Sequence, residues 1–299
     1  MPLDFSLDSI QHSEFGVGRD IEGEENYALL PVDAQVQTAL QEMAKNTWLT
    51  ICGFEGEGRA YEPSEKYESQ EYVFLSIENA LGEYLRGLHR ANNMALDAGA
   101  LNPASALYCY FARFTDRNGR RLTAVRRATQ FKGIVMSRLV QFMTDALKIV
   151  EDATFRLDHD FDLLIDSNLI HILRPAGFEA IGKLQEAVCG AVPANIETIS
   201  AQMEFVDFDR IREFAENHPR AARYLASIRS LGETVNISRP LLVNACAAHG
   251  IGIEEVDGRI SILAGNEMDF LNVLDRRMYR LELVEGTPER YKAGSRKKL

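Results

Sequence analysis

Short apolar runs separated by brief turn signals most limit how this chain can fold. Leu107–Phe114 is aromatic and strand-like, and Arg121–Val125 can return beside it after the dipeptide Asn118-Gly119. Asn-Gly favours a tight turn because both residues tolerate positive φ. Runs joined so closely predict antiparallel hairpins, because a parallel crossover needs about a dozen or more connecting residues.

Two further hairpins follow from the same reasoning. Phe161–Ile165 and Leu169–Leu173 flank a three-residue turn, and their nearly continuous apolar character predicts a central place in the sheet. Asp257-Gly258 predicts a hairpin within Ile253–Leu263.

Helical patterns surround these runs. Asp33 can cap a helix whose apolar positions recur at Val36, Ala39, Leu40 and Met43. Similar patterns predict helices over residues 77–88, over several segments beyond residue 175, over 238–250 and around 270. The Glu-rich stretches 20–28 and 55–72 are expected to be solvated loops. The predicted fold class is α+β, with a mainly antiparallel sheet flanked by helices.

Charge is distributed unevenly along the 299 residues. Residues 1–100 hold 18 acidic and 6 basic side chains, whereas the remainder holds 26 acidic and 27 basic ones, although the formal net charge is −11. We therefore predict an acidic N-terminal α/β subdomain over 1–102 and an α+β domain with a basic tail over 103–299. The first residues lack a signal peptide pattern, and no apolar run approaches the length of a membrane span. Both features predict a cytoplasmic protein.

The strongest candidate binding surface is a basic cluster at residues 113–138. It contains eight basic side chains and one acid, Asp116. Nucleic-acid phosphates favour such a local concentration because each neutralised phosphate releases condensed counterions. A second basic feature is the C-terminal tail. The residues predicted to bind nucleic acid are Arg113, Arg117, Arg120, Arg121, Arg126, Arg127, Lys132, Arg296, Lys297 and Lys298.

Aromatic side chains interleave with this cluster. Tyr108, Tyr110, Phe114 and Phe131 are candidates for stacking on bases. The alternative is that the arginines pair with acidic groups of the same molecule or of a neighbouring one, and that the tail is a solvated terminus.

A second constellation is acidic. Asp158, Asp160, Asp162 and Asp166 lie close together in sequence and would suit a divalent metal in a nuclease. Asp is also common at strand ends and in turns, where it accepts local hydrogen bonds. We favour this structural interpretation and keep the metal-dependent nuclease as the alternative.

Other catalytic or cofactor chemistry has no support in the sequence. The cysteines, Cys52, Cys109, Cys189 and Cys246, are widely spaced, which predicts buried free thiols. His171 lies in an apolar strand and is expected to be a hydrogen-bonded core residue. We predict no catalytic residue, no metal and no cofactor.

Taken together, several segments resemble the Kiwa protein KwaB family. In Phe155–Ile165 an Asp precedes apolar residues, then a short turn leads to Leu169–Leu173, and Phe178-Glu179 opens a helix. Asp269–Asp275 and the Lys-rich end resemble the closing element of that family. The resemblance covers roughly residues 105–299, and its motif residues Asp162, Phe178 and Glu179 are expected to be structural.

This resemblance implies a component of a bacterial antiphage defence system. It implies DNA as a ligand, a small multi-pass membrane protein (KwaA-like) as a partner and recruitment to the inner membrane by that partner. The chain is further expected to be a homo-oligomer, a dimer, without enzymatic activity. A protein-binding sensor subunit without nucleic-acid contact is a third possibility.

Overall fold

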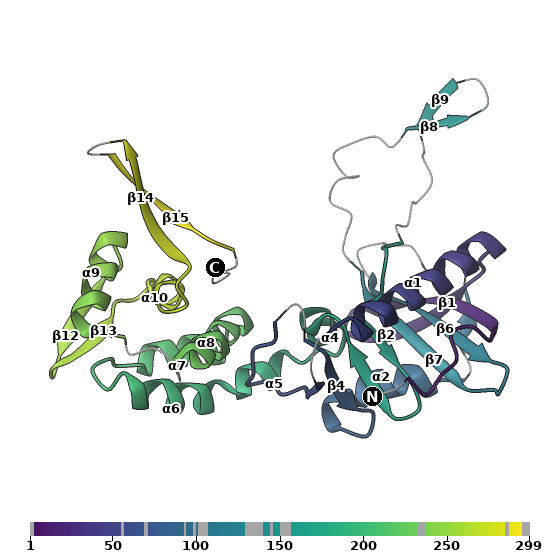
Figure 1. Ribbon diagram of the computed structural model, residues 1–299, viewed down its shortest axis with the longest axis horizontal. Coiled ribbons are helices and arrows are strands. Elements are labelled where there is room, and N and C mark those ends of the chain that lie inside the picture. Colours follow the sequence, from purple (N-terminus) through teal and green to yellow (C-terminus); the bar gives the residue numbers. More distant parts are fainter. Residues whose placement is uncertain are drawn as a thin grey trace. The chain divides into compact units, whose positions relative to one another are not determined.

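The structure is a computed structural model that describes residues 3–54, 57–68, 71–92, 94–97, 100, 107–128, 140–143, 146–149, 157–232, 237–284 and 287–294. The chain forms two compact units (Figure 1). Unit 1 contains residues 1–61 and 67–184, and unit 2 contains residues 62–66 and 185–299.

A nine-stranded sheet organises unit 1. Its strand order is β3-β4-β11-β10-β7-β6-β1-β2-β5, and neighbouring strands are antiparallel except for the outermost pairs, β3–β4 and β2–β5. The predicted α+β class with a mainly antiparallel sheet is therefore confirmed. The strands are β1 (Ile10–Ile21), β2 (Glu24–Leu30), β3 (Arg59–Ala60), β4 (Val73–Ser76), β5 (Ala95–Leu96), β6 (Leu107–Asp116), β7 (Arg121–Arg127), β10 (Leu163–Ile165) and β11 (Leu169–Ile172).

Strands β1 and β2 correct the prediction that residues 20–28 form a solvated loop, because β1 continues to Ile21 and β2 begins at Glu24. Strand β1 pairs with both β2 and β6, and the turn between β1 and β2 contains Glu22 and Gly23, both at positive φ. The sequence of β1 mixes polar residues and glycines, so its periodicity does not reveal a central strand. Gly16 allows its neighbours to approach closely, because a Cβ there would lie 2.3 Å from a ring carbon of Phe111.

Helices cover both faces of this sheet. Helix α1 (Ala34–Cys52), capped by Asp33 as predicted, packs Leu40 and Met43 on the face that includes Leu122 and Ala124 of β7. Residues on a strand alternate between faces, so the intervening Thr123 and Val125 point to the opposite side. That side is covered by α2 (Glu83–Arg90), which follows the short helix η1 (Ala80–Gly82), and by α4 (Pro175–Ile181).

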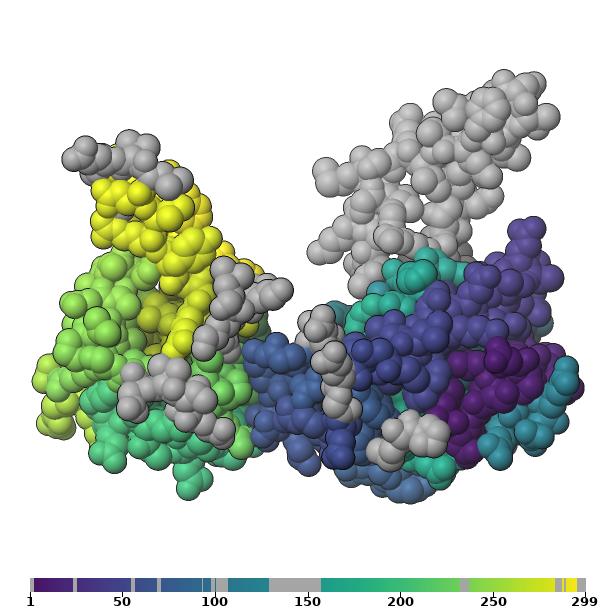
Figure 2. Space-filling model, in the orientation of Figure 1, coloured from purple at the N-terminus to yellow at the C-terminus, as the bar shows by residue number. Residues whose placement is uncertain are grey.

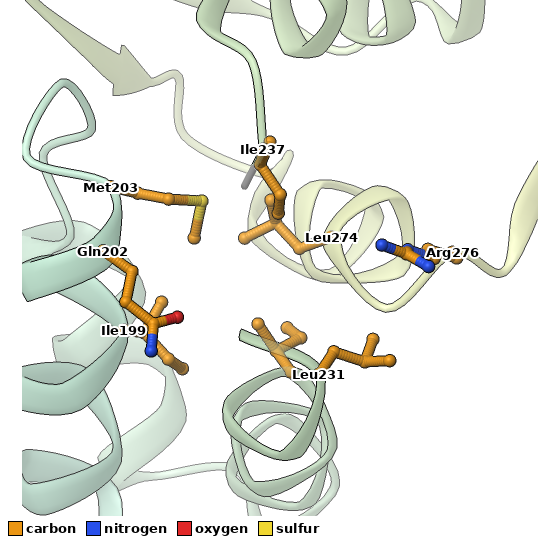
Figure 3. Close-up of a pocket in the computed structure, with 8 residues that line it drawn as sticks. Ile199, Gln202, Met203, Leu231, Ile237, Leu274 and Arg276 are labelled. Carbon is orange, nitrogen blue, oxygen red and sulfur yellow. The ribbon is translucent and has the colours of Figure 1, made fainter. Parts of the chain in front are cut away.

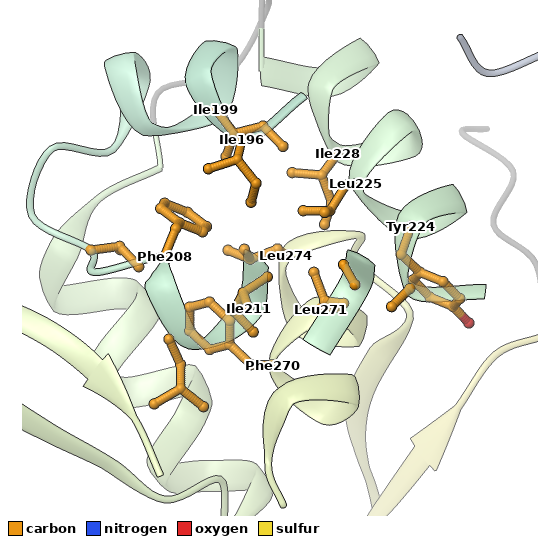
Figure 4. Close-up of a cluster of buried hydrophobic side chains, with 14 of the residues drawn as sticks. Ile196, Ile199, Phe208, Ile211, Tyr224, Leu225, Ile228, Phe270, Leu271 and Leu274 are labelled. Carbon is orange, nitrogen blue, oxygen red and sulfur yellow. The ribbon is translucent and has the colours of Figure 1, made fainter. Parts of the chain in front are cut away.

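Unit 2 is mainly helical and has its own hydrophobic core (Figure 4). Helix α8 packs against four other helices, and Leu225 and Ile228 on it meet Phe270 and Leu271 in the core. The helices of unit 2 are α5 (Gln185–Gly190), α6 (Val192–Gln202), α7 (Asp209–Glu216), α8 (Pro219–Gly232), α9 (Arg239–His249) and α10 (Glu267–Leu274).

The remaining strands form three separate hairpins. β12 (Ile253–Val256) and β13 (Arg259–Ile262) confirm the hairpin predicted at Asp257-Gly258. β14 (Met278–Val284) pairs with β15 (Thr287–Lys292), and β8 (Val140–Met143) pairs with β9 (Ala146–Ile149).

The compact units divide the chain between residues 184 and 185, whereas we expected a boundary between 102 and 103. The acidic first third does not form a compact unit of its own, because β1 is hydrogen-bonded to β6 along nearly its whole length. Long-range strand pairing of this kind leaves no trace in local composition.

Candidate nucleic-acid interface

The hairpin β6–β7 carries most of the arginines that the sequence singles out. Its turn, residues 117–120, is held by Asp116, whose Oδ1 accepts hydrogen bonds from the backbone N–H of Asn118 (2.8 Å) and Arg120 (3.0 Å). Of the predicted Asn-Gly pair, Gly119 takes positive φ and Asn118 does not. Asp116 is almost fully buried, so this acid organises the turn rather than facing the solvent beside the arginines.

Arg113 points into unit 1 rather than into solvent. Its side chain is 4% exposed and forms an ion pair with Glu14 of β1 at 2.8 Å. It also donates a hydrogen bond to the carbonyl oxygen of Ala91. Burial lowers its pKa, and the charge of Glu14 opposes this effect. Arg113 is therefore a structural residue, which corrects its assignment as a nucleic-acid contact.

Arg126 is also engaged internally. Its guanidinium contacts Asp162 at 2.8 Å, Asp158 at 3.1 Å and Asp160 at 3.4 Å. Although burial opposes the charge of Arg126, the carboxylates of Asp162 and Asp158 raise its pKa. The alternative of intramolecular pairing thus applies to Arg126, and its assignment to a nucleic-acid surface is corrected.

The acidic constellation is a network of ion pairs. Besides Arg126, Arg174 donates to both carboxylate oxygens of Asp160, each at 2.7 Å. Asp162 also accepts from the backbone N–H of Arg127 at 2.8 Å. Within the described residues, no group of three His, Cys, Asp or Glu side chains is placed to hold a metal ion. The carboxylates of Asp158, Asp160 and Asp162 thus belong to a polar network with Arg126 and Arg174 at the strand end.

Asp166 caps the turn between β10 and β11. It accepts from the backbone N–H of Asn168 and Leu169, and its other oxygen lies 3.0 Å from Nε2 of His171. Burial opposes its ionisation, but the hydrogen bond from His171 and those from the backbone lower its pKa to about 2. Nδ1 of the fully buried His171 lies 2.7 Å from the hydroxyl of Tyr72, which confirms a hydrogen-bonded core histidine.

Three arginines gather at the turn of the hairpin. Arg117 and Arg120 are exposed, and Arg121 is half-buried. Arg120 pairs with Asp4, while Arg121 donates to the carbonyl oxygen of His89 (3.0 Å) and to Oδ1 of Asn92 (3.1 Å). We call Arg117, Arg120 and Arg121 the turn arginines.

The turn arginines differ in their partners, because Arg120 pairs with a carboxylate whereas Arg121 donates to uncharged groups. The imidazole of His89 lies beside Arg121 and contacts Oγ1 of Thr123 at 2.9 Å. Burial, and secondly the charge of Arg121, lowers the pKa of His89 to about 4, so His89 is neutral at pH 7. The hydrogen bonds of Arg121 to neutral groups orient its guanidinium without cancelling its charge.

Arg127 is exposed but lies at the other end of β7. Six residues along an antiparallel strand span about 20 Å, so Arg127 and the turn arginines form separate sites. The predicted residues Lys132, Arg296, Lys297 and Lys298 lie outside the described residues.

The aromatic residues proposed for base stacking are mostly in the core. Tyr110 is 2% exposed and Phe114 is fully buried, which excludes both from contact with a base. The hydroxyl of Tyr108 contacts the hydroxyl of Tyr27, and the ammonium group of Lys183 lies over the Tyr108 ring. Phe131 lies outside the described residues.

The family motif residues Phe178 and Glu179 contact other side chains inside unit 1. Phe178 is fully buried and packs edge-on against Tyr61, with ring centroids 4.8 Å apart. Glu179 accepts a hydrogen bond from the Tyr61 hydroxyl at 3.0 Å. All four cysteines are free thiols, but only Cys109 and Cys246 are buried, whereas Cys52 is exposed.

A pocket in unit 2 offers little chemistry of its own (Figure 3). Its walls are apolar except for Gln202 and Arg276, and they come from α6, α8, α10 and the residues after them. The apolar lining residues are Ile199, Met203, Ile228, Leu231, Ile237 and Leu274.

The sequence patterns did not reveal the roles of three polar or aromatic residues. Arg174 stands directly before a proline, which gave no hint of its pairing with Asp160. Tyr279 and Tyr291 are exposed and stack on each other across β14 and β15. The alternation of uncharged and charged residues in Tyr279–Glu282 was the available signal for this pair.

Comparison with known proteins identifies the family. A family model described as Kiwa protein KwaB-like matches residues 105–283. The chain belongs to this family. Membership makes it a component of the Kiwa antiphage defence system, as the resemblance in the sequence implied. No curated protein and no solved structure gave a match.

The family region includes parts of both units. It begins at residue 105, two residues before β6, and ends in β14, so it leaves out β1 and β2 of the same sheet. Within the described part of the chain, none of the helices combines the length and apolar character needed to cross a bilayer.

Proposed function

We propose that this chain is the DNA-binding component of its Kiwa system. The observation that carries the proposal is the group of turn arginines at the end of the β6–β7 hairpin. Arg117 and Arg120 are exposed at a turn whose own acid, Asp116, is buried, and the ion pair of Arg120 with Asp4 is itself open to solvent, where such pairs are weak. Positive charge at the tip of a hairpin can approach a phosphate backbone closely.

The binding is electrostatic and depends little on base sequence. Arginines make charge-assisted, bidentate hydrogen bonds with phosphate oxygens, and such contacts position a protein on DNA without reading its bases. A net charge of −11 repels DNA at long range, so binding relies on this local concentration of arginines.

The proposal also includes partners and location. In it, the chain is a cytoplasmic homodimer without enzymatic activity that a KwaA-like multi-pass protein recruits to the membrane. Family membership supports the membrane partner. The pairing of Asp158, Asp160 and Asp162 with Arg126 and Arg174 supports a binding protein over a metal-dependent nuclease.

The turn arginines can be tested by charge reversal. We expect Arg117→Glu combined with Arg120→Glu to weaken binding to duplex DNA and to flatten its salt dependence. Each lost phosphate contact reduces the slope of log K against log salt by about 0.9. Fluorescence anisotropy with a labelled duplex at several salt concentrations measures both quantities.

A matched control reverses two exposed arginines of unit 2, Arg212→Glu with Arg259→Glu. The net charge then changes equally, so a purely global effect would appear in both variants. Equal affinity and equal salt slope for the turn variant and the unaltered protein would contradict the proposed site.

A further inference from the structure

The hairpin β14–β15, which we call the C-terminal ribbon, presents an aromatic face to solvent. Tyr279 and Tyr291 lie directly opposite each other and are 50% and 37% exposed. Their rings are stacked, with centroids 5.4 Å apart and an interplanar angle of 16°. Leu281 on the same face is 42% exposed. In Figures 1 and 2 the ribbon extends beyond the helices of unit 2.

The opposite face of the ribbon is mostly basic. Met278 on this face packs against the core of unit 2, and the ammonium group of Lys292 pairs with Asp269 of α10 at 3.1 Å. Farther along the ribbon, Arg280 and Arg290 lie directly opposite each other and are both exposed. The carboxylate of Glu282 lies 3.8 Å from the Arg280 guanidinium in an exposed ion pair, which is weak enough for a phosphate to compete with it. Like charges at directly opposed positions destabilise a strand pair, and an anion between the two arginines would offset the repulsion that remains.

These two faces match the two parts of a nucleotide. A pair of parallel rings is a preformed platform that a base can extend by stacking, while an opposed arginine pair suits a phosphate. In a duplex the bases are stacked on one another and are not accessible in this way. Exposed bases are a property of single strands.

We propose that the C-terminal ribbon binds single-stranded nucleic acid. Tyr279 and Tyr291 stack on bases, and Arg280 and Arg290 hold the backbone phosphates. This inference rests on the proposed function and deepens it, because it adds a second site with a preference for single strands.

A membrane surface is the competing ligand for an exposed aromatic face with nearby arginines. Glu289 argues against it, because its carboxylate lies on the aromatic face and accepts a hydrogen bond from the Tyr291 hydroxyl. Inserting that face into a bilayer would desolvate a carboxylate, which is costly. Beside a base, the same carboxylate can accept hydrogen bonds from amino groups.

The test compares single strands with duplexes in the full chain. The probes are labelled oligo-dT of about 15 nucleotides, close to the upper range of such binding sites, and a duplex of equal length. Tyr279→Ser with Tyr291→Ser should weaken oligo-dT binding by about tenfold for each tyrosine. Duplex binding should remain unchanged. Tyr279→Phe with Tyr291→Phe should keep the oligo-dT affinity, because the rings and not the hydroxyls stack.

Two further variants separate stacking from loss of the fold. Leu241→Ser removes an even more exposed apolar side chain from α9 of the same unit, and this variant should bind oligo-dT normally. Arg280→Gln with Arg290→Gln leaves the tyrosine pair in place and should reduce the salt slope for oligo-dT by about 0.7 for each lost phosphate contact.

Unchanged oligo-dT affinity in the serine variant would overturn the inference. So would a serine variant that keeps its oligo-dT affinity but no longer binds vesicles of phosphatidylglycerol and phosphatidylethanolamine, because the face would then be a membrane surface. Duplex binding that still depends on Arg117 and Arg120 would leave the proposed function standing in both cases. Absence of any DNA binding by the unaltered protein would instead refute the proposed function.

Discussion

Arg113 and Arg117 stand four residues apart, yet their surroundings differ completely. Arg113 lies within β6, where its side chain meets Glu14 of the neighbouring strand, whereas Arg117 lies in the exposed turn. A buried arginine is held by its ion pair and cannot contact a phosphate without losing it. The basic cluster of the sequence is thus divided by burial into structural and exposed arginines.

At the residue scale, His89 should make stability depend on pH. Its pKa is lowered from 6.5 to about 4, chiefly by burial, so the unfolded chain binds a proton more readily than the folded protein between these values. The stability that comes from keeping His89 neutral is fully present above pH 6.5 and is lost as the pH falls to 4. We expect the unfolding free energy to decrease by about 3 kcal/mol across this window because of His89.

Urea denaturation at a series of pH values measures this effect. His89→Asn keeps a polar atom near Oγ1 of Thr123 but does not titrate, so its stability should vary less between pH 6.5 and 4. The difference between the two proteins removes the contribution of carboxylates that titrate near pH 4. Parallel curves for the variant and the unaltered protein would show that His89 is not the group responsible.

At the element scale, turn chemistry predicted where the hairpins lie. In the β12–β13 turn both Asp257 and Gly258 take positive φ, as a two-residue hairpin turn of this type requires. The β6–β7 turn is longer and relies on hydrogen bonds to Asp116. Both hairpins were predicted correctly, although the second uses a different local geometry from the one expected.

The close approach of β1 to its neighbours can be tested at Gly16. Gly16→Ala should destabilise the protein by about 1–3 kcal/mol, because the added methyl group overlaps the ring of Phe111 and the carbonyl oxygen of Ala28. Thermal and chemical denaturation of the purified variant measure the loss.

Gly87 in the exposed part of α2 provides the matched control for that substitution. Apart from its own helix backbone and chain neighbours, a Cβ at this position would meet no described atom within 4 Å. Gly87→Ala should therefore be neutral or stabilising by about 1 kcal/mol, because alanine favours a helix more than glycine does. If Gly16→Ala were as well tolerated as Gly87→Ala, the close approach of β1 to β6 would be refuted.

At the scale of the whole molecule, each unit has hydrophobic packing of its own. Unit 1 has a buried cluster between the sheet and α1 and further buried side chains on the face covered by α2 and α4, while the core of unit 2 lies among α6, α7, α8 and α10. The family region, residues 105–283, contributes to both cores. Residues before 105 complete the sheet of unit 1, so the acidic first third is part of the same compact unit as the turn arginines.

A large-to-small substitution should therefore act within one unit. Phe270→Ala removes a fully buried ring from the core of unit 2, which should cost about 3–5 kcal/mol. Hydrogen exchange of the full chain should show reduced protection in α6 and α8, while β6 and β7 keep theirs.

Phe114→Ala, in the core of unit 1, should give the reverse pattern. Each substitution thus controls for the other, because both remove one fully buried phenylalanine. Equal loss of protection in both units from either substitution would show that the two cores unfold as one.

Local sequence patterns predict the hairpins, the principal helices, the α+β class and the family resemblance. These depend on short-range periodicity and turn chemistry, such as Asp33 at the start of α1 and Gly250 in the left-handed conformation at the end of α9. Tertiary structure alone decided that β1 is an inner strand, that the units divide after residue 184, and that Arg113 and Arg126 are paired inside the protein. The physical reason is that strand pairing and desolvation join residues far apart in the chain. Local charge shows where arginines are concentrated, but burial decides which of them can meet a phosphate.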